Sequence, residues 1–435
     1  MSGQLALRFR GKLSDLSTDD RKNLVDRSSV ADKEVAGITA AIIERVRDEG
    51  DDALFALARE LDGVEMYSLA VPRDVIRSAF DSFDPSMREV MQRAAQNIER
   101  VHREWLPKEQ QLEVQPGVIV GRRPDPLNRV GIYAPGGRAA YPSSVLMGAI
   151  PARVAGVSEI VLCSPPGKNG LPSNSVLVAA EIAGIDKVFA IGGAGAIAAM
   201  ALGTKTIPRV DKIVGPGNAF VAEAKIQLAS VVAFDSPAGP SELVVIADDS
   251  ADPQVIAREL LAQAEHDPRA IVLAIAIGDK VAHKIESALS SILESATRRE
   301  IIAESLATRG GVVSVANVSE AVAAANAFAP EHLMIATKNP GSIVSSIRNA
   351  GTVFLGETSS VAFGDYLTGA NHVLPTGGLA RSYSGLSTLD FFRWTTWQSV
   401  TRDGASALAM DTAAFAECEG LDAHADAARA WGAGT

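Results

Sequence analysis

Cysteine, aromatic side chains and clustered positive charge are all scarce in this chain. The two cysteines among 435 residues, Cys163 and Cys418, are too few for a disulfide framework, and Cys163 lies in an apolar run typical of a buried strand. The formal net charge is -11 and no stretch gathers Lys and Arg on one face, which argues against a nucleic-acid partner. Apolar stretches such as 270–278 are far too short to span a bilayer, and residues 1–13 lack the apolar core of a signal peptide. We therefore expect a cytoplasmic protein that binds neither nucleic acid nor membrane.

Glycine and a regular α/β pattern are what the chain does have. It contains 37 glycines, 47% hydrophobic and 21% charged residues, a composition that suits a folded protein with many strand-to-helix turns. Residues 30–110 show helical periodicity, whereas from residue 130 short apolar strands alternate with glycine turns and helices. This alternation predicts parallel, doubly wound sheets. Strands are expected at Val118–Gly121, Val130–Tyr133, Glu159–Leu162, Lys187–Ile191, Lys212–Val214, Leu243–Ile246, Ala270–Ile277, Gly311–Val315, His332–Ile335 and Val353–Leu355.

The turn Gly193–Ala198 matches the dinucleotide fingerprint G-x-G-x-x-A, after a strand and at a helix start. The acidic residue that should end the next strand is missing there, because Asp211 instead opens one. A strand-to-helix turn that permits close packing is the favoured interpretation. A phosphate could still approach the helix N-terminus, whose unpaired backbone amides favour anions.

Two polar pairs could carry chemistry on or near helix ends. Gln263 and His266 are three residues apart and share one helix face, so they could reach one ion, or His266 could mark an exposed helix end. Glu331 and His332 follow a proline and could act as two general bases, or as a capping ion pair at a turn. Each pair taken alone favours the structural interpretation.

The segment 364–378 is long, punctuated by glycine and too polar for a core strand, as functional loops often are. Asp365 offers an oxygen ligand there and His372 a nitrogen, although a structural loop with an Asp turn explains the pattern equally well. His424 lies near the C-terminus, where a histidine is ordinarily a bystander. Two further histidines are assigned to solvated helices and given no role: His102 and His283.

Six motifs, in this order along the chain, resemble those of the histidinol dehydrogenase family. The resemblance runs from about residue 30 to the C-terminus. The motifs are Val130–Gly137, Val214–Asn218, Ala238–Glu242, Gln263–His266, Pro330–Leu333, and Gly364–Tyr366 with Asn371–Thr376.

The resemblance implies an NAD-dependent enzyme with one zinc ion per subunit that oxidises L-histidinol through L-histidinaldehyde to L-histidine. It assigns the zinc to Gln263, His266, Asp365 and His424. His332 would take the alcohol proton and Glu331 would activate water for the second oxidation. The implied substrate contacts are Ser241, Gln263, His266, His332, Asp365, His372 and Glu419. The implied cofactor contacts are Tyr133, Asn218 and Gly195, at which the family usually has Gln.

The resemblance also implies two Rossmann-like, doubly wound α/β domains with small terminal extensions in an intertwined homodimer. The predicted division is an N-terminal extension at 1–29, a first α/β domain at 30–129 plus 242–385 with most metal and catalytic residues, and a second at 130–241 on the cofactor side. A tail domain at 386–435 would bring Glu419 and His424 to the partner's site. The aromatic segment Phe391–Trp397 would pack in the core of the tail or form an altered substrate wall.

Two alternatives remain open. The chain could be a paralogue that oxidises another small polar alcohol, such as a sulfonated propanediol, because specificity depends on a few polar pocket contacts. A catalytically dead binding protein is less favoured, because the metal and base residues are all present.

Overall fold

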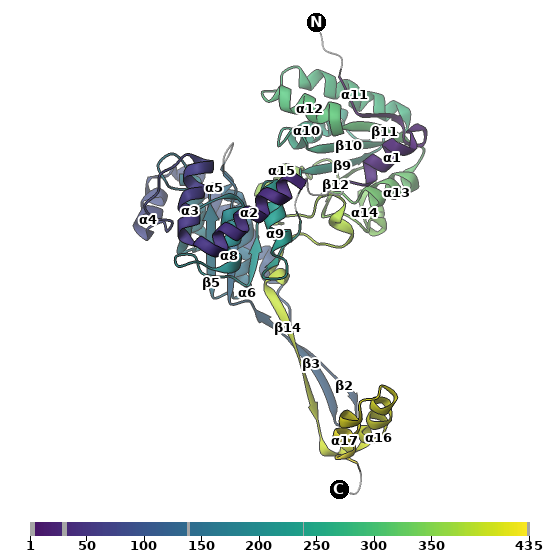
Figure 1. Ribbon diagram of the computed structural model, residues 1–435. Helices are drawn as coiled ribbons and strands as arrows, with labels where there is room; N and C mark the ends of the chain where they lie inside the picture. Colours follow the sequence, from purple (N-terminus) through teal and green to yellow (C-terminus); the bar gives the residue numbers. More distant parts are fainter. Residues whose placement is uncertain (1–4, 28–32, 137–139, 238, 433–435) are drawn as a thin grey trace.

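Two parallel sheets stand side by side, and a long antiparallel sheet extends away from them (Figure 1). The computed structural model describes residues 5–27, 33–136, 140–237 and 239–432. The predicted α/β class with parallel sheets is confirmed. Within the described residues, no helix combines the length and apolar character needed to cross a membrane.

The five-stranded sheet has the order β6-β5-β4-β7-β8 and is parallel throughout. Its strands are nearly continuous apolar runs, because helices cover both faces of a doubly wound sheet. The chain turns from β4 to one side and later to the other, so the switch point lies between β4 and β7. The strands are β4 (Arg129–Tyr133), β5 (Glu159–Ser164), β6 (Lys187–Ala190), β7 (Lys212–Val214) and β8 (Ala233–Phe234). The connecting helices are α6 (Pro142–Ala155), α7 (Asn174–Ala183), α8 (Gly193–Leu202) and α9 (Ala219–Gln227).

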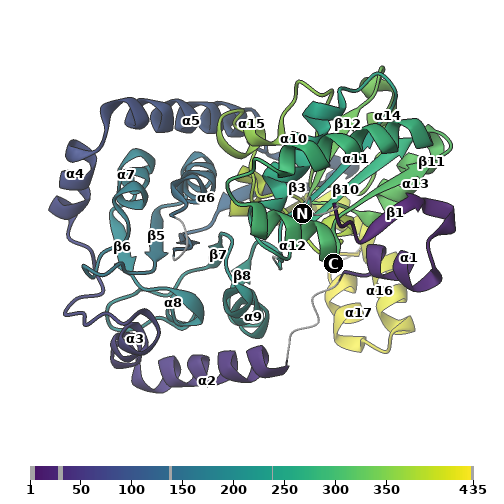
Figure 2. The ribbon, with the colours of Figure 1, turned by 90° about the horizontal axis from the view of Figure 1, so that it is seen from above.

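The N-terminal helices also belong to this layer. Buried residues such as Ile43, Leu54 and Ile98 join one core with Val130 and Ile132 of β4, and Figure 2 shows the helices around that sheet. Residues 30–129 were grouped above with 242–385, and for these helices that grouping is wrong. An apolar helix face can pack against either sheet, so the helical periodicity of the sequence does not predict which sheet these helices cover. The helices are α2 (Lys33–Glu49), α3 (Asp51–Leu57), the π-helix η2 (Ala58–Asp62), α4 (Arg73–Ser82) and α5 (Pro85–Glu104).

The six-stranded sheet has the order β1-β11-β10-β9-β12-β13, again parallel. The N-terminal extension supplies its edge strand, β1 (Phe9–Lys12), and the helix α1 (Thr18–Val25). The other strands are β9 (Glu242–Ala247), β10 (Ile271–Ile277), β11 (Gly311–Val315), β12 (His332–Ala336) and β13 (Thr352–Leu355). The helices are α10 (Pro253–Ala264), α11 (Asp279–Leu293), α12 (Arg299–Arg309), α13 (Val318–Phe328), α14 (Pro340–Ile343) and α15 (Val361–Tyr366).

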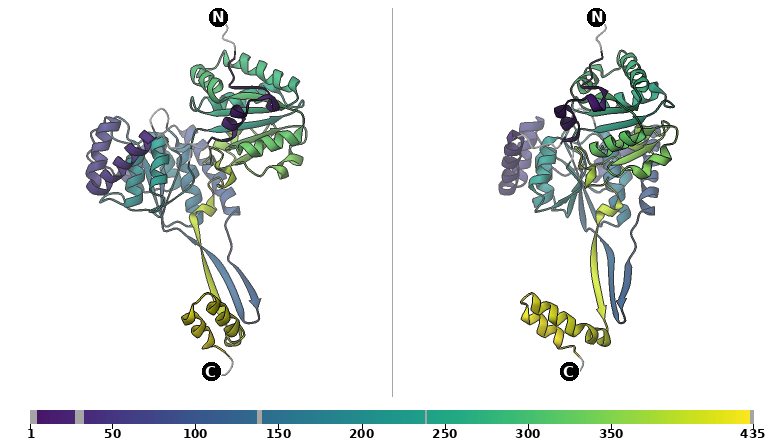
Figure 3. Two further views of the ribbon diagram at one scale, coloured as in Figure 1. Left: turned by 45° about the vertical axis from the view of Figure 1, so that its right-hand side comes forward. Right: turned by 90° about the vertical axis from the view of Figure 1, so that its right-hand side faces the viewer.

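The third sheet and the last two helices form a stalk (Figure 3). Strand β3 pairs antiparallel with β2 and with β14, whose nine residues include most of the aromatic segment Phe391–Trp397. In this segment Trp397 packs over Gly121 of β3, and the Arg122 guanidinium lies 4.4 Å from the centre of the Trp394 ring. The stalk comprises β2 (Gln110–Gln115), β3 (Val118–Pro126), β14 (Phe392–Val400), α16 (Arg402–Cys418) and α17 (Asp422–Arg429).

His102 lies at the root of the stalk and not in solvent, which corrects its assignment above. Its side chain is buried at the end of α5, and Nδ1 accepts the backbone N–H of Thr388 at 3.2 Å. Burial lowers the His102 pKa to about 4, although the Asp390 charge opposes this. The ring is therefore neutral in the folded protein near pH 7. His283, as predicted, is exposed.

Candidate active site

The predicted acid–imidazole pair lies at the amino edge of the six-stranded sheet. His332 opens β12 and Glu242 opens β9, and because these strands are parallel neighbours their first residues meet. Before them, Ala329 ends α13 with φ 54°, the one left-handed non-glycine conformation among the described residues. Such a conformation costs of order 1 kcal/mol and persists where surrounding contacts fix it. The turn thereby sets where Glu331 enters the sheet.

Glu242 holds both members of the pair. Its backbone N–H donates to Glu331 Oε2 at 2.7 Å, and the Glu331 N–H donates back to Glu242 Oε2 at 3.3 Å. His332 Nδ1 lies 3.1 Å from the Glu242 carbonyl oxygen, which can only accept, so Nδ1 carries a proton. The other ring nitrogen, Nε2, lies 3.5 Å from Asp365 Oδ1. In the neutral ring, Nε2 is therefore the basic atom.

Buried charges set the ionisation of the pair. Burial alone would lower the His332 pKa, but the carboxylates of Glu331 and Asp365 outweigh it and raise that pKa to about 10. Burial opposes ionisation of Asp365 as well, yet the hydrogen bond and charge of His332 lower the Asp365 pKa. Burial raises the pKa of Glu242, against the attraction of Arg27. The site concentrates negative charge around one imidazole.

Asp365 lies in the last turn of α15, which ends at Tyr366, so only the later part of the predicted loop 364–378 is non-helical. His372 donates through Nδ1 to the backbone carbonyl of Asp365 at 2.9 Å. In the same loop, Asn371 donates to the carbonyl of Met147 in α6 at 2.7 Å, and the Gly377 N–H donates to Glu242 at 2.9 Å. The loop thus contacts both parallel-sheet units.

Two of the predicted metal ligands lie on or just after α10, which is tied to the helix that carries Asp365. Glu259 of α10 accepts the N–H of Val361 at 3.0 Å and so ties α10 to α15. Gln263, one turn further along α10, is buried, and its Nε2 has no hydrogen-bond partner, which fits an amide oriented by a ligand. His266 is exposed just beyond the helix, close enough for its charge to act on Asp365. Ser241 precedes β9 and is half-buried.

His424 and Glu419 do not reach this site within one chain. Both are exposed at the end of the stalk, away from the two parallel sheets (Figures 1 and 3). Across the described residues, no three His, Cys, Asp or Glu side chains gather into a metal-binding group. The predicted zinc set differs from such a group because it uses the Gln263 amide and the distant His424.

The predicted cofactor residues lie at the carboxyl edge of the five-stranded sheet. Tyr133 ends β4, and its hydroxyl oxygen accepts the N–H of Gly193 at 3.0 Å, while burial raises the Tyr133 pKa to about 12. Asn218 follows β7 and caps α9 by accepting two backbone N–H groups at 3.1 Å. These positions flank the switch point between β4 and β7, where open α/β sheets bind ligands. Gly195 lies in the first turn of α8, where a Cβ would be 2.9 Å from Leu57.

The two edges approach each other near two tyrosines. Tyr141 immediately precedes α6, on the cofactor side, and Tyr366 follows Asp365. Burial raises the Tyr366 pKa, and the charges of Asp365, Tyr141 and Glu265 add to the rise. Tyr141 therefore lies within electrostatic range of Tyr366.

Two buried ion pairs beside these edges escaped the sequence analysis. Arg27 pairs with Glu242 beneath the acid–imidazole pair, with 3% and 1% of their side chains exposed. Lys225 donates to the Gly215 carbonyl at 2.6 Å and to Asp235 at 2.7 Å, beneath the turn after β7. Glu242 belongs to the motif Ala238–Glu242, for which a role was predicted only at Ser241. The sequence around Arg27 and Lys225 contains no pattern that predicts a buried ion pair.

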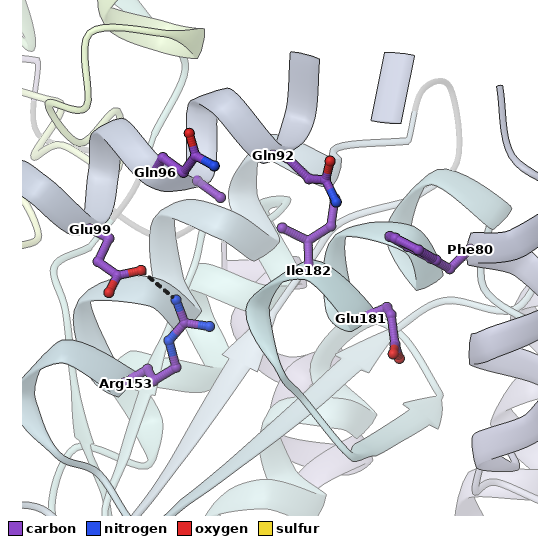
Figure 4. Close-up of a pocket in the computed structure, with 8 residues that line it drawn as sticks. Phe80, Gln92, Gln96, Glu99, Arg153, Glu181 and Ile182 are labelled. Carbon is purple, nitrogen blue, oxygen red and sulfur yellow. Dashed lines mark hydrogen bonds and ion pairs between the residues drawn. The ribbon is translucent and has the colours of Figure 1, made fainter. Parts of the chain in front are cut away.

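A separate hollow of about 460 Å³ lies among the helices that cover the five-stranded sheet (Figure 4). Helices α4 to α7 line it, and Arg153 crosses it to bind Glu99 at 2.9 Å. Glu181, which also lines it, pairs with Arg73 of α4 at 2.5 Å. The hollow contains none of the predicted site residues.

Comparison with known proteins gives one consistent result. A sequence model of the histidinol dehydrogenase family matches residues 25–431. The histidinol dehydrogenase of Methanothermobacter thermautotrophicus is 48% identical over 93% of this chain and 95% of its own, and that of Chlorobium luteolum is 44% identical over 95% and 94%. The crystal structure of histidinol dehydrogenase from Elizabethkingia anophelis superposes with a TM-score of 0.93 at 35% identity, covering 98% of both chains.

Proposed function

The chain belongs to the histidinol dehydrogenase family of NAD-dependent oxidoreductases of histidine biosynthesis, and we propose that it oxidises L-histidinol at the Glu331–His332 pair. One observation carries this proposal: a buried imidazole is fixed through Nδ1 by a backbone carbonyl, with Nε2 directed at Asp365. That arrangement leaves a single nitrogen to exchange protons with a substrate.

In the proposed mechanism, bound NAD supplies the hydride acceptor, with a fresh NAD molecule for each of the two oxidations. His332 Nε2 takes the proton of the substrate hydroxyl in the first oxidation. Glu331 then accepts a proton from the water that adds to the aldehyde, through the carboxylate whose other oxygen is occupied by the Glu242 N–H. After release of its proton, His332 Nε2 takes the proton of the hydrated aldehyde in the second oxidation.

Zinc fits the oxygen and nitrogen donors at this site. Gln263, His266 and Asp365 would supply three ligands, with His424 of the partner subunit as the fourth. The ion would seat the imidazole and amine of the substrate and offset the negative charge that raises the His332 pKa. Substrate contacts by Ser241, His372 and Glu419, and cofactor contacts by Tyr133, Asn218 and Gly195, complete the proposed site.

We also propose a homodimer in which each stalk completes the partner's site. Exposed apolar side chains on the stalk, among them Leu112 and Phe415 with 68% and 69% exposed, support burial against a second copy. The two free cysteines suit the proposed cytoplasmic location.

NADH formation from histidinol, against a panel of small polyols, tests the substrate, and absence of NADH from histidinol would overturn the proposed reaction. Mixing the inactive variants Asp365→Ala and His424→Ala tests the shared site. Random exchange makes half the dimers mixed, each with one intact site, so about a quarter of the activity should return. No recovery under conditions of proven exchange would contradict the dimer proposal.

A further inference from the structure

A buried ion pair joins the N-terminal extension to the acid–imidazole pair. Arg27 Nε and Nη2 donate to the two carboxylate oxygens of Glu242 at 3.0 and 3.1 Å. Arg27 Nη1 donates to the carbonyl of Leu24 at 2.9 Å, and its guanidinium lies 3.4 Å from the centre of the Phe328 ring. The guanidinium is therefore fixed on several sides, in the two-pronged geometry that orients a carboxylate.

Glu242 transmits this orientation to the site. Its carboxylate accepts the N–H groups of Glu331 at 3.3 Å and of Gly377 at 2.9 Å. Its main chain holds Glu331 Oε2 through the N–H and His332 Nδ1 through the carbonyl. A rotation of the Glu242 side chain would break its bonds to the N–H groups of Glu331 and Gly377, and the main chain that carries Glu331 and His332 could then shift.

Without Arg27, Glu242 has no cation among its hydrogen-bond partners in the described residues. A buried carboxylate that loses its cation either takes up a proton or moves toward water. Protonation turns one carboxylate oxygen into a hydroxyl that also donates, which weakens the backbone N–H bond accepted at that oxygen.

We propose that Arg27 is a positioning residue, which holds Glu242 as an oriented carboxylate and thereby fixes Glu331 and His332 for proton transfer. The inference rests on the proposed function for its kinetic consequence. Because the cofactor residues lie on the other sheet, loss of Arg27 should lower kcat and leave the KM for NAD nearly unchanged.

Arg27→Met removes the cation and keeps an apolar stem beside Phe328, while Arg27→Lys keeps the charge without the fork. Misplacement of a reacting group can cost up to about a hundredfold in rate, so we expect kcat for Arg27→Met to fall at least tenfold with the KM for NAD within about twofold. The kcat of Arg27→Lys should fall less than that of Arg27→Met. Arg10→Met is the matched control, since it removes an ion pair to Glu286 elsewhere in the same extension and should keep kcat within about twofold.

The double variant Arg27→Met/Glu242→Gln separates positioning from stability, and it carries the test if Arg27→Met alone fails to fold. It leaves no uncompensated buried charge, so its Tm should return toward the wild-type value while kcat stays low. Recovery of kcat together with Tm, or kcat for Arg27→Met within threefold of wild type, would overturn the positioning role.

A crystal structure of Arg27→Met or of the double variant reports on the same role without activity. Loss of the bond between the Glu242 N–H and Glu331 Oε2 is expected, and an unchanged bond would refute the inference. If wild-type protein forms no NADH from histidinol, the proposed function fails, and this structural measurement still decides whether Arg27 orients Glu331.

Discussion

Replacing Lys225 by Met tests how the fold holds the cofactor edge. Lys225 and Asp235 are 2% and 6% exposed, and Asp235 also accepts the Gly215 N–H at 2.7 Å. Gly215 has φ 115°, and a Cβ there would lie 2.1 Å from the carbonyl oxygen of Tyr133, so the turn presses directly against β4. The ion pair therefore supports the segment that leads to Asn218.

The magnitude follows from burial. Removing one partner of a buried pair costs about 3–5 kcal/mol, because the remaining charge is left uncompensated. For a domain of this size, 1 kcal/mol corresponds to roughly 2–4 °C in Tm, so Lys225→Met should lower the Tm by about 10 °C. The Gly215 turn should loosen as well, which we expect to raise the KM for NAD at least about fivefold, equivalent to roughly 1 kcal/mol.

Thermal unfolding and NAD saturation kinetics measure both effects. The double variant Lys225→Met/Asp235→Asn leaves no charge, and its amide oxygen can still accept the Gly215 N–H, so it should regain more than half of the lost Tm. Lys187→Met is the control, because its pair with Glu159 is largely exposed and is worth about 0–1 kcal/mol. A Tm change for Lys225→Met no larger than the control, or no recovery in the double variant, would refute the reasoning.

Other substitutions and conditions give further predictions. His332→Ala should lower histidinol oxidation by about 10²–10⁴-fold with zinc content unchanged in metal analysis, and retained turnover would mean that another group is the base. Glu331→Gln should slow aldehyde oxidation more than alcohol oxidation, measured with each substrate separately; equal slowing would contradict its assignment to water. The neutral His102, with a pKa of about 4 against 6.5 when unfolded, stabilises the fold fully above about pH 6.5 and loses this contribution as pH falls toward 4. This difference is on the order of 3 kcal/mol, so Tm of wild type should drop more steeply than that of His102→Asn between pH 7 and 4.5, and parallel curves would count against it. Dialysis against a chelator should abolish activity and added zinc should restore it, whereas full activity without metal would exclude the zinc proposal.

Buried strands were the most predictable part of this fold. Lys212–Val214 and Gly311–Val315 begin and end where the sequence predicts them, because each is a fully buried run between turn residues. The stalk strand β14 was missed, because its partly exposed residues show no clean alternation. Its partner β3 is also far away in the sequence: Asp125 of β3 and Thr395 of β14, which contact each other, are 270 residues apart. Helical periodicity also could not predict that helices α2 to α5 pack on the five-stranded sheet.

The candidate site was predictable only as far as its residues carry local patterns. Glu331, His332 and Asp365 stood in polar segments of recognisable motifs, and the structure brings these three together. Arg27 contacts Glu242 across 215 residues, and an isolated arginine in a coil gives no sign of burial. His102 was misassigned because charged neighbours on α5 suggest solvent, whereas packing against Thr388 depends on tertiary structure.

The proposed proton-transfer residues and the proposed cofactor contacts lie on different sheets, at opposite strand ends. The proposed proton-transfer groups lie where strands of one sheet begin, and the proposed cofactor contacts lie where strands of the other sheet end. A relative could therefore exchange one alcohol for another by altering the first set while inheriting the second intact. Conversely, a change in cofactor preference need not alter the proton-transfer groups, and the loop from Asn371 to Gly377, which has hydrogen bonds to both sides, would be affected by a change on either.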